Sequence, residues 1–153
     1  INSDADHIIT PTEKGPQDCI QEALDVAAVI PEEVATWDMH ATATPGDWRE
    51  LQNTLSVFPG TTRLTARKGS FGHGMSVCGG WELTAQHMGF ARGILHPVDL
   101  EEEEIHPQMQ PHRESLVEHE KATLEGQVAG KLNMGVGGVN ACVISRLWEE
   151  ESE

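Results

Sequence analysis

The chain has 153 residues, of which 38% are hydrophobic and 23% are charged, and its formal net charge is −15. This composition is typical of a soluble globular domain with a core of its own, and no apolar run is long enough to span a bilayer. The strong negative charge argues against a surface that binds nucleic acid.

The first forty residues predict a helix followed by a buried strand. The opening segment INSDADHIIT has neither the basic start nor the apolar stretch of a secretory signal. It begins with Ile1 rather than Met, so we expect a chain cut from a longer one. Apolar residues at helical spacing between 15 and 30 predict a helix that ends before Pro31. The alternating segment VATWDMH then predicts a strand that ends at His40.

Residues 46–68 predict a second helix and a second strand. GDWRELQNTLSVF carries apolar residues at helical spacing over residues 46–58. Asp47 and Glu50 stand three apart at its start, as in a capping box. The segment TTRLTARK, residues 61–68, predicts a strand because its threonines favour extended backbone. It runs into a glycine-rich turn around His73.

A third helix is predicted directly after this turn. Its paired glycines, Gly79 and Gly80, cost about 1 kcal/mol each relative to alanine, so they indicate another backbone packed very close. The residues expected on its buried stripe are Cys78, Trp81, Ala85 and Met88.

The C-terminal third predicts an irregular segment and then two strands. Residues 96–126 are rich in Pro, His and Glu, with one short helix expected near 114–121. The acidic runs at Glu101–Glu104 and in the tail 149–153 are interpreted as solvated surface. GQVAGKLNMGVGGVNACVISRLW predicts two strands joined by a glycine turn. Helices alternating with strands favour an α/β layered architecture.

Two histidines follow predicted strands, His40 in HATATPGDWRE and His73 in KGSFGHG. Turns at strand ends commonly carry functional groups, although a single histidine is more often structural than catalytic. A helix N-terminus beside His73 would favour the neutral imidazole, which can donate a hydrogen bond to an oxygen on which charge develops. Lys68 would reinforce the neutral form.

The environment of Lys68 leaves two interpretations open. A buried lysine needs a carboxylate partner, and Asp47 and Glu50 are available. Alternatively, these two carboxylates only cap their helix while Lys68 faces water. Spacing alone favours neither interpretation.

Two further patterns are weaker. The glycine-rich segment NMGVGGVNA lacks the lysine of a P-loop and precedes a strand, so it is no phosphate loop. Its backbone N–H groups could serve as oxyanion donors, although a plain tight turn is the commoner role. His106, His112 and His119 lie among glutamates without the i, i+4 spacing of a helical zinc pair, so we expect no metal site.

Three segments together resemble a known family. The segments are DMHATATPGDWRE, then RKGSFGHG, whose histidine comes 33 positions after the first one, and then MGVGGVNACVI. They resemble the C-terminal half of the β-ketoacyl synthases. These are the condensing enzymes of fatty-acid and polyketide synthesis. The resemblance covers nearly the whole chain and is weakest across residues 98–126. It implies a thiolase-like fold, layered α/β/α with a mixed sheet, of which residues 1–153 would form the C-terminal half, and it implies a dimer or larger assembly.

The resemblance also implies roles for individual residues. His40 and His73 match two histidines that hydrogen-bond a thioester oxygen while enolate charge builds. Lys68 matches a lysine that positions the His73 turn, with Asp47 and Glu50 as its carboxylate partners. Thr42 and Thr44 match threonines that contact the pantetheine arm. The Val136 N–H matches an oxyanion donor in the glycine turn, which includes Gly135 and Gly137. Met134 and Val136 stand where the family commonly has two phenylalanines that gate the acyl pocket.

The nucleophilic cysteine of such enzymes belongs to the N-terminal half, and Cys19, Cys78 and Cys142 lie in no matching context. We expect these three to be small core residues of a reduced, cytoplasmic protein. The implied function is decarboxylative condensation of an acyl thioester with a malonyl thioester, incomplete without the N-terminal half. The implied partner is acyl carrier protein, with no cofactor beyond its phosphopantetheine arm. The alternative is a non-catalytic ketosynthase-like subunit, of the chain-length-factor type, that pairs with a catalytic chain.

Overall fold

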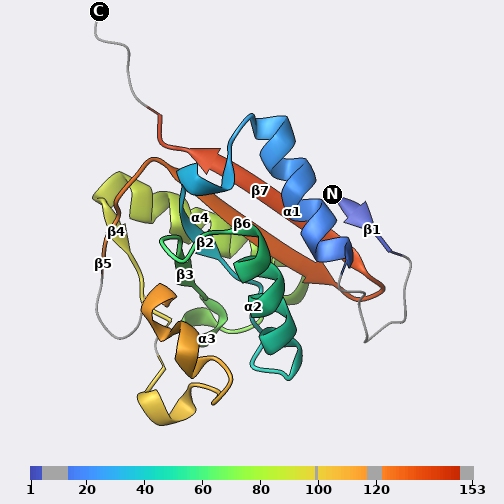
Figure 1. Cartoon of the computed structure of the whole chain (residues 1–153), viewed down its shortest axis with the longest axis vertical. Coiled ribbons are helices and arrows are strands. Elements are labelled where there is room, and N and C mark those ends of the chain that lie inside the picture. Colours follow the sequence, from blue (N-terminus) through green and yellow to red (C-terminus); the bar gives the residue numbers. More distant parts are fainter. Residues whose placement is uncertain (5–13, 99, 117–121, 149–153) are drawn as a thin grey trace, which may run out of the picture.

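The computed structural model describes residues 1–4, 14–98, 100–116 and 122–148, and its main element is a five-stranded mixed sheet (Figure 1). The strands follow the order β1 (Asn2–Ser3), β7 (Val139–Arg146), β6 (Val128–Gly135), β2 (Val34–Asp38) and β3 (Arg63–Thr65). β2 runs parallel to β3 and β6, whereas β7 runs antiparallel to β6 and β1. A second sheet pairs β4 (Ile94–Leu95) with β5 (Ala122–Thr123).

Helices lie on both faces of the main sheet. α1 (Lys14–Ala27) and α2 (Gly46–Val57) cover one face, and α4 (Cys78–Arg92) packs on the other (Figure 1). The connecting helical turns are η1 (Pro31–Glu33), the one-turn α3 (Lys68–Phe71), η2 (Met75–Val77), η3 (Glu102–Glu104) and η4 (Gln110–Ser115). The predicted α/β layers with a mixed sheet are confirmed. No described helix has the length and apolar character needed to cross a membrane.

The register of β2 against β6 decides which side chains face the core and which face the site. Trp37 pairs with Gly130 on the face covered by α1 and α2, and its ring lies 4.5 Å from that of Phe58. The next pair along, Asp38 and Lys131, therefore points to the opposite face, toward α4. A hydrophobic core thus lies on one side of these strands and a set of buried charges on the other.

Most elements predicted from the first 68 residues and the C-terminal hairpin are confirmed. α1 ends at Ala27 because Ala28 adopts a left-handed conformation with φ of 52°, three residues before Pro31. β2, α2 and β3 fall within the predicted segments, and β6 and β7 form the predicted antiparallel pair.

α4 buries a different face from the one predicted. Trp81 and Met88 are 50% and 47% exposed. The buried side chains on this helix are Cys78, Glu82, Gln86 and Phe90. Glu82 and Gln86 are buried because the sheet supplies partners, the Lys131 ammonium and the Gly130 carbonyl. Cys78 of the predicted stripe is therefore buried as expected, whereas the described residues leave Trp81 and Met88 about half exposed.

Two smaller predictions also change. A Cβ at Gly79 would lie 2.8 Å from the Asn133 side chain, but one at Gly80 would meet nothing within 4 Å, so among the described residues no second backbone packs on this pair. The helix predicted at 114–121 is replaced, as far as it is described, by the 3₁₀ turn η4. Residues 117–121, including His119, and the acidic tail 149–153 lie outside the described residues.

Candidate active site

The first part of the site is a tight turn, residues 40–44, that follows β2. Four consecutive backbone N–H groups of this turn donate to two carboxylates of α2. Glu50 accepts from His40 and, at 2.8 Å, from Ala41; Asp47 accepts from residues 42 and 43 at 3.0 and 2.8 Å. Two alanines, Ala41 and Ala43, have positive φ of 26° and 58°. Such conformations cost about 1–3 kcal/mol each, so the two carboxylates hold the turn in a shape it would not keep alone.

Neither sequence interpretation of Asp47 and Glu50 is correct. The N-cap of α2 is Pro45, which forms no side-chain cap, so the pair is not a capping box. Their hydrogen bonds go to the preceding turn and not to Lys68. The i, i+3 spacing places both carboxylates on one face of α2, and that face looks at the turn.

Lys68 is buried and has three partners for its three protons. It donates to the His40 carbonyl, lies 3.3 Å from His40 Nδ1, and lies 2.9 Å from Glu82 Oε1. The side chains of Lys68 and Glu82 are 6% and 0% exposed. The carboxylate partner of Lys68 is therefore Glu82 on α4, and the lysine contacts the first histidine directly.

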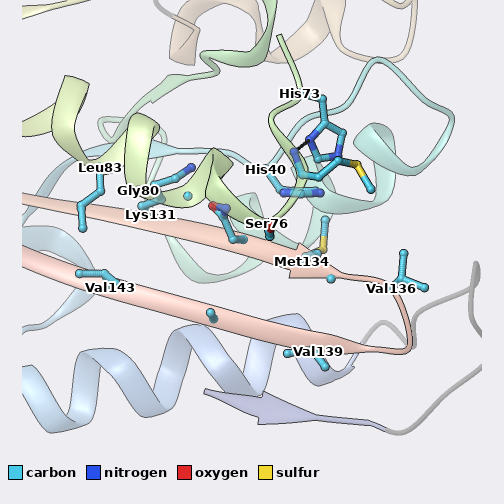
Figure 2. A pocket seen from close by; sticks show the side chains of 15 residues that line it. His40, His73, Ser76, Gly80, Leu83, Lys131, Met134, Val136, Val139 and Val143 are labelled. Atoms are coloured by element: carbon cyan, nitrogen blue, oxygen red, sulfur yellow. Dashed lines mark hydrogen bonds between the residues drawn. The ribbon is translucent and has the colours of Figure 1, made fainter. Parts of the chain in front are cut away.

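His73 lies in the turn between α3 and η2, and its ring contacts the ring of His40. The ring centroids are 5.9 Å apart at an interplanar angle of 87°, and Figure 2 shows the two rings together at one end of the pocket. The His73 Nδ1 accepts the Met75 N–H at 3.3 Å, and the His40 Nδ1 faces the Lys68 ammonium, which can only donate. In the neutral state each ring therefore carries its proton on Nε2.

The surroundings of His40 keep it neutral. Burial, followed by the positive charges of Lys68 and Lys131, lowers the pKa of His40 to about 3. Burial also raises the pKa of Glu50 to about 7, against the opposing effect of the N–H groups that it accepts. At neutral pH the His40 ring is thus an uncharged hydrogen-bond donor.

Behind the histidines lies a chain of buried charges that sequence reasoning missed. Lys131 Nζ lies 2.6 Å from Glu82 Oε2 and 3.8 Å from Asp38 Oδ2, and Arg67 Nε lies 2.8 Å from the same Asp38 oxygen. Burial alone would raise the pKa of Glu82, but Lys131 and Lys68 outweigh it and hold that pKa below its usual value. For Asp38 burial dominates and raises the pKa, against Lys131 and Arg67. The available signal was a lysine and an aspartate in strands that are otherwise mostly apolar.

A cavity of about 580 Å³ opens beside the two histidines, between α4 and the exposed face of β6 and β7 (Figure 2). Among the residues singled out from the sequence, Met134, Gly135 and Val136 line it, and Gly137 does not. Thr42 and Thr44 also lie outside the lining; their hydroxyls are 3.1 Å apart in the turn after His40. Lining residues that the sequence did not single out include Ser76, Leu83, Lys131, Val139 and Val143.

The three cysteines are free and lie away from this cavity's lining. Cys19 and Cys78 are buried, and Cys142 is half-buried on the core side of β7. Burial raises the pKa of Cys19 and raises that of Cys142 to about 12, which disfavours the thiolate that a nucleophile needs. Among the described residues, no three His, Cys, Asp or Glu side chains are grouped so that they could hold a metal ion.

Comparisons with known proteins point to one family. A family model described as "Beta-ketoacyl synthase, C-terminal domain" matches residues 1–99. A 3-oxoacyl-[acyl-carrier-protein] synthase I, chloroplastic, of Arabidopsis thaliana is 33% identical over 148 residues, covering 94% of this chain and 30% of the relative. The chain thus spans about a third of the length of the curated relatives that it matches.

Solved structures agree with this. A beta-ketoacyl synthase from Burkholderia phymatum superimposes with a TM-score of 0.88 at 26% identity, over 97% of this chain and 36% of that one. The ishigamide ketosynthase/chain length factor superimposes with a TM-score of 0.84 at 23% identity, over 96% of this chain and 36% of that one. At this identity the similarity concerns the fold alone. The mixed α/β sheet is therefore that of the ketosynthases, the thiolase-like fold.

Proposed function

The chain belongs to the β-ketoacyl synthase family, whose C-terminal domain it matches, and we propose that it supplies the two catalytic histidines of a decarboxylative condensation. The observation that carries the proposal is the convergence of His40 and His73, with ring centroids 5.9 Å apart. Both rings have Nδ1 engaged and Nε2 available as a donor. Two N–H donors at one point suit an oxygen that becomes negative during reaction.

The reaction proceeds in two steps at this point. The C–C bond to the malonyl carboxylate breaks, CO₂ leaves, and the electron pair moves into the thioester as an enolate whose oxygen accepts from the Nε2–H groups of His40 and His73. The enolate carbon then attacks the carbonyl of an acyl thioester, forming a C–C bond, and the thiolate leaves and takes up a proton. Because His40 is uncharged at neutral pH, its Nε2–H donates a hydrogen bond to the enolate oxygen and keeps its proton.

The acylated cysteine comes from a complementary N-terminal half, in the same parent polypeptide or on a separate chain. The cysteines of this chain do not suit the role, since Cys19 and Cys78 are buried and the pKa of Cys142 is about 12. A second observation supports the complementary half. The apolar side of α4 and the neighbouring face of β7 are open, with Trp81, Val139 and Val143 each between 42% and 50% exposed.

The substrate carrier would be acyl carrier protein, which the name of the Arabidopsis thaliana relative mentions. Its phosphopantetheine arm would enter past Thr42 and Thr44, and no other cofactor is needed for the steps above. The Val136 N–H would be a further oxyanion donor, because this residue lines the cavity with the histidines. A non-catalytic partner subunit, the alternative, has no chemical need for two converging imidazoles held by a buried lysine.

The test uses the complex of this chain with its complementary half. His73→Ala should lower malonyl-thioester decarboxylation by about 10²-fold or more, the usual cost of one oxyanion donor, and leave acyl transfer to the cysteine intact. His106→Ala, which changes an exposed histidine of the 100–116 segment, is the matched control and should leave both rates unchanged. Loss of acyl loading with decarboxylation preserved would contradict the assigned role. A wild-type complex that decarboxylates nothing would favour the non-catalytic alternative.

A further inference from the structure

Lys131 has no counterpart among the residues that the family resemblance assigns, yet it lies between the cavity and the buried charges. It comes from the middle of β6, lines the cavity, and its side chain is only 4% exposed. Figure 2 shows it under α4, on the strand that leads to Met134 and the glycine turn. An ammonium group in such a place is stable only if carboxylates pair with it.

Its partners connect it to the first histidine in two steps. Lys131 Nζ lies 2.6 Å from Glu82 Oε2, and the other oxygen, Oε1, lies 2.9 Å from Lys68 Nζ. Lys68 in turn contacts the His40 carbonyl and Nδ1. The two oxygens of Glu82 are therefore divided between two lysines, and each lysine limits where the carboxylate can point.

We propose that Lys131 is a positioning residue for the condensation proposed above: its ammonium group holds Glu82 in the orientation that keeps Lys68 against His40. Without Lys131, Glu82 loses the partner of one oxygen while remaining fully buried, and it would draw Lys68 toward itself and away from Nδ1. The effect on catalysis rests on the proposed function. The contacts of Lys131 with Glu82, and of Glu82 with Lys68, are present in this chain whatever its function.

The charges that face His40 come from every element packed around it. They are Glu50 on α2, Lys68 on α3, His73 in the next turn, Glu82 on α4 and Lys131 on β6. Asp38 on β2 and Arg67 lie behind them, paired with each other, and Asp38 also lies near Lys131. Replacing Lys131 by Met removes one positive charge from this set, and also leaves Glu82 less neutralised. Both changes favour the imidazolium, so His40 should protonate at a higher pH.

The experiment uses the chain in complex with its complementary half, with ¹⁵N-labelled histidine in this chain alone. The His40 signal is assigned by its absence from a His40→Gln variant. We expect Lys131→Met to raise the pH midpoint of His40 by about one unit or more. The double variant Lys131→Met/Glu82→Gln loses one charge of each sign and should return the midpoint close to wild type. Lys14→Met, at an exposed lysine that pairs with Asp18 on α1, should shift nothing.

Each outcome decides the proposal. An unchanged His40 midpoint in folded Lys131→Met overturns it, and so does a double variant shifted as far as the single one, since Lys131 would then not act through Glu82. If the Met variant does not fold, Lys131→Gln keeps a polar contact with Glu82 without the charge, and the same shift is expected from it.

A second arm separates this proposal from the proposed function. In the complex with the complementary half, Lys131→Met should move the acid limb of the pH profile of malonyl-thioester decarboxylation upward by the same amount. If the wild-type complex does not decarboxylate, the proposed function fails, while the His40 measurement still decides the role of Lys131.

Discussion

Gly130 on β6 offers a stringent test of how the core sets the geometry of the site. A Cβ at this position would lie 2.2 Å from Cζ3 and 2.3 Å from Cε3 of Trp37. The indole is fully buried and packs on Phe58, so it cannot move aside without displacing the core. Overpacking of this kind costs about 1–3 kcal/mol, and the rigid neighbour favours the upper end for Gly130→Ala.

Urea unfolding followed by circular dichroism measures the effect. Gly60→Ala is the matched control, because a Cβ at Gly60 meets nothing within 4 Å, and we expect no loss of stability from it. Trp37→Leu makes room for the new methyl group, so a double-mutant cycle with Gly130→Ala should give a favourable coupling of about 1–2 kcal/mol. If Gly130→Ala is as stable as wild type, or if the two substitutions are additive, the packing described here is incorrect.

Three further predictions concern the site and the chain as a whole. The folded pKa of His40, about 3, is below the ordinary value of 6.5, so the unfolded state takes up the proton first and stability falls as pH drops from about 6.5 toward 3. His40→Gln should weaken this dependence in pH-resolved unfolding, and an unchanged slope would refute it. Glu50→Gln replaces one of two acceptors of the His40 turn, so amide exchange at residues 40 and 41 should accelerate at least tenfold, which unchanged protection would contradict. The isolated chain should be unstable or oligomeric because its apolar α4 side is open; a monodisperse monomer with cooperative unfolding would count against this.

The parts of the fold that depend on local pattern could be predicted from the sequence. The helical spacing that gives α1 and α2, and the alternation that gives β2, arise from residues close in the chain, and the β6–β7 pair follows from one glycine turn. The pairing of His40 with His73 was expected only from the family resemblance, because they lie 33 positions apart in the sequence. Sequence spacing alone gives no distance between two turns.

The errors have physical causes in long-range contacts. Glu82 and Lys131 are 49 residues apart, and nothing near either one indicates a partner for its charge. The spacing of Asp47 and Glu50 suits both a helix cap and hydrogen bonds to the backbone of the preceding turn. Only the path of that turn decides which N–H groups the two carboxylates accept from. Trp81 was expected in the core because it is apolar, but in part of a larger fold an apolar side chain can belong to a surface that another segment covers.

The function proposed for this site requires that both imidazoles donate to the same developing oxyanion. A crystal structure of the complex with the complementary half, bound to an unreactive malonyl-thioester analogue, tests this directly. We expect the thioester oxygen to lie within about 3 Å of Nε2 of both His40 and His73. A thioester oxygen that contacts only one ring, or that lies outside the cavity between α4 and β6, would contradict the proposed role of the two histidines.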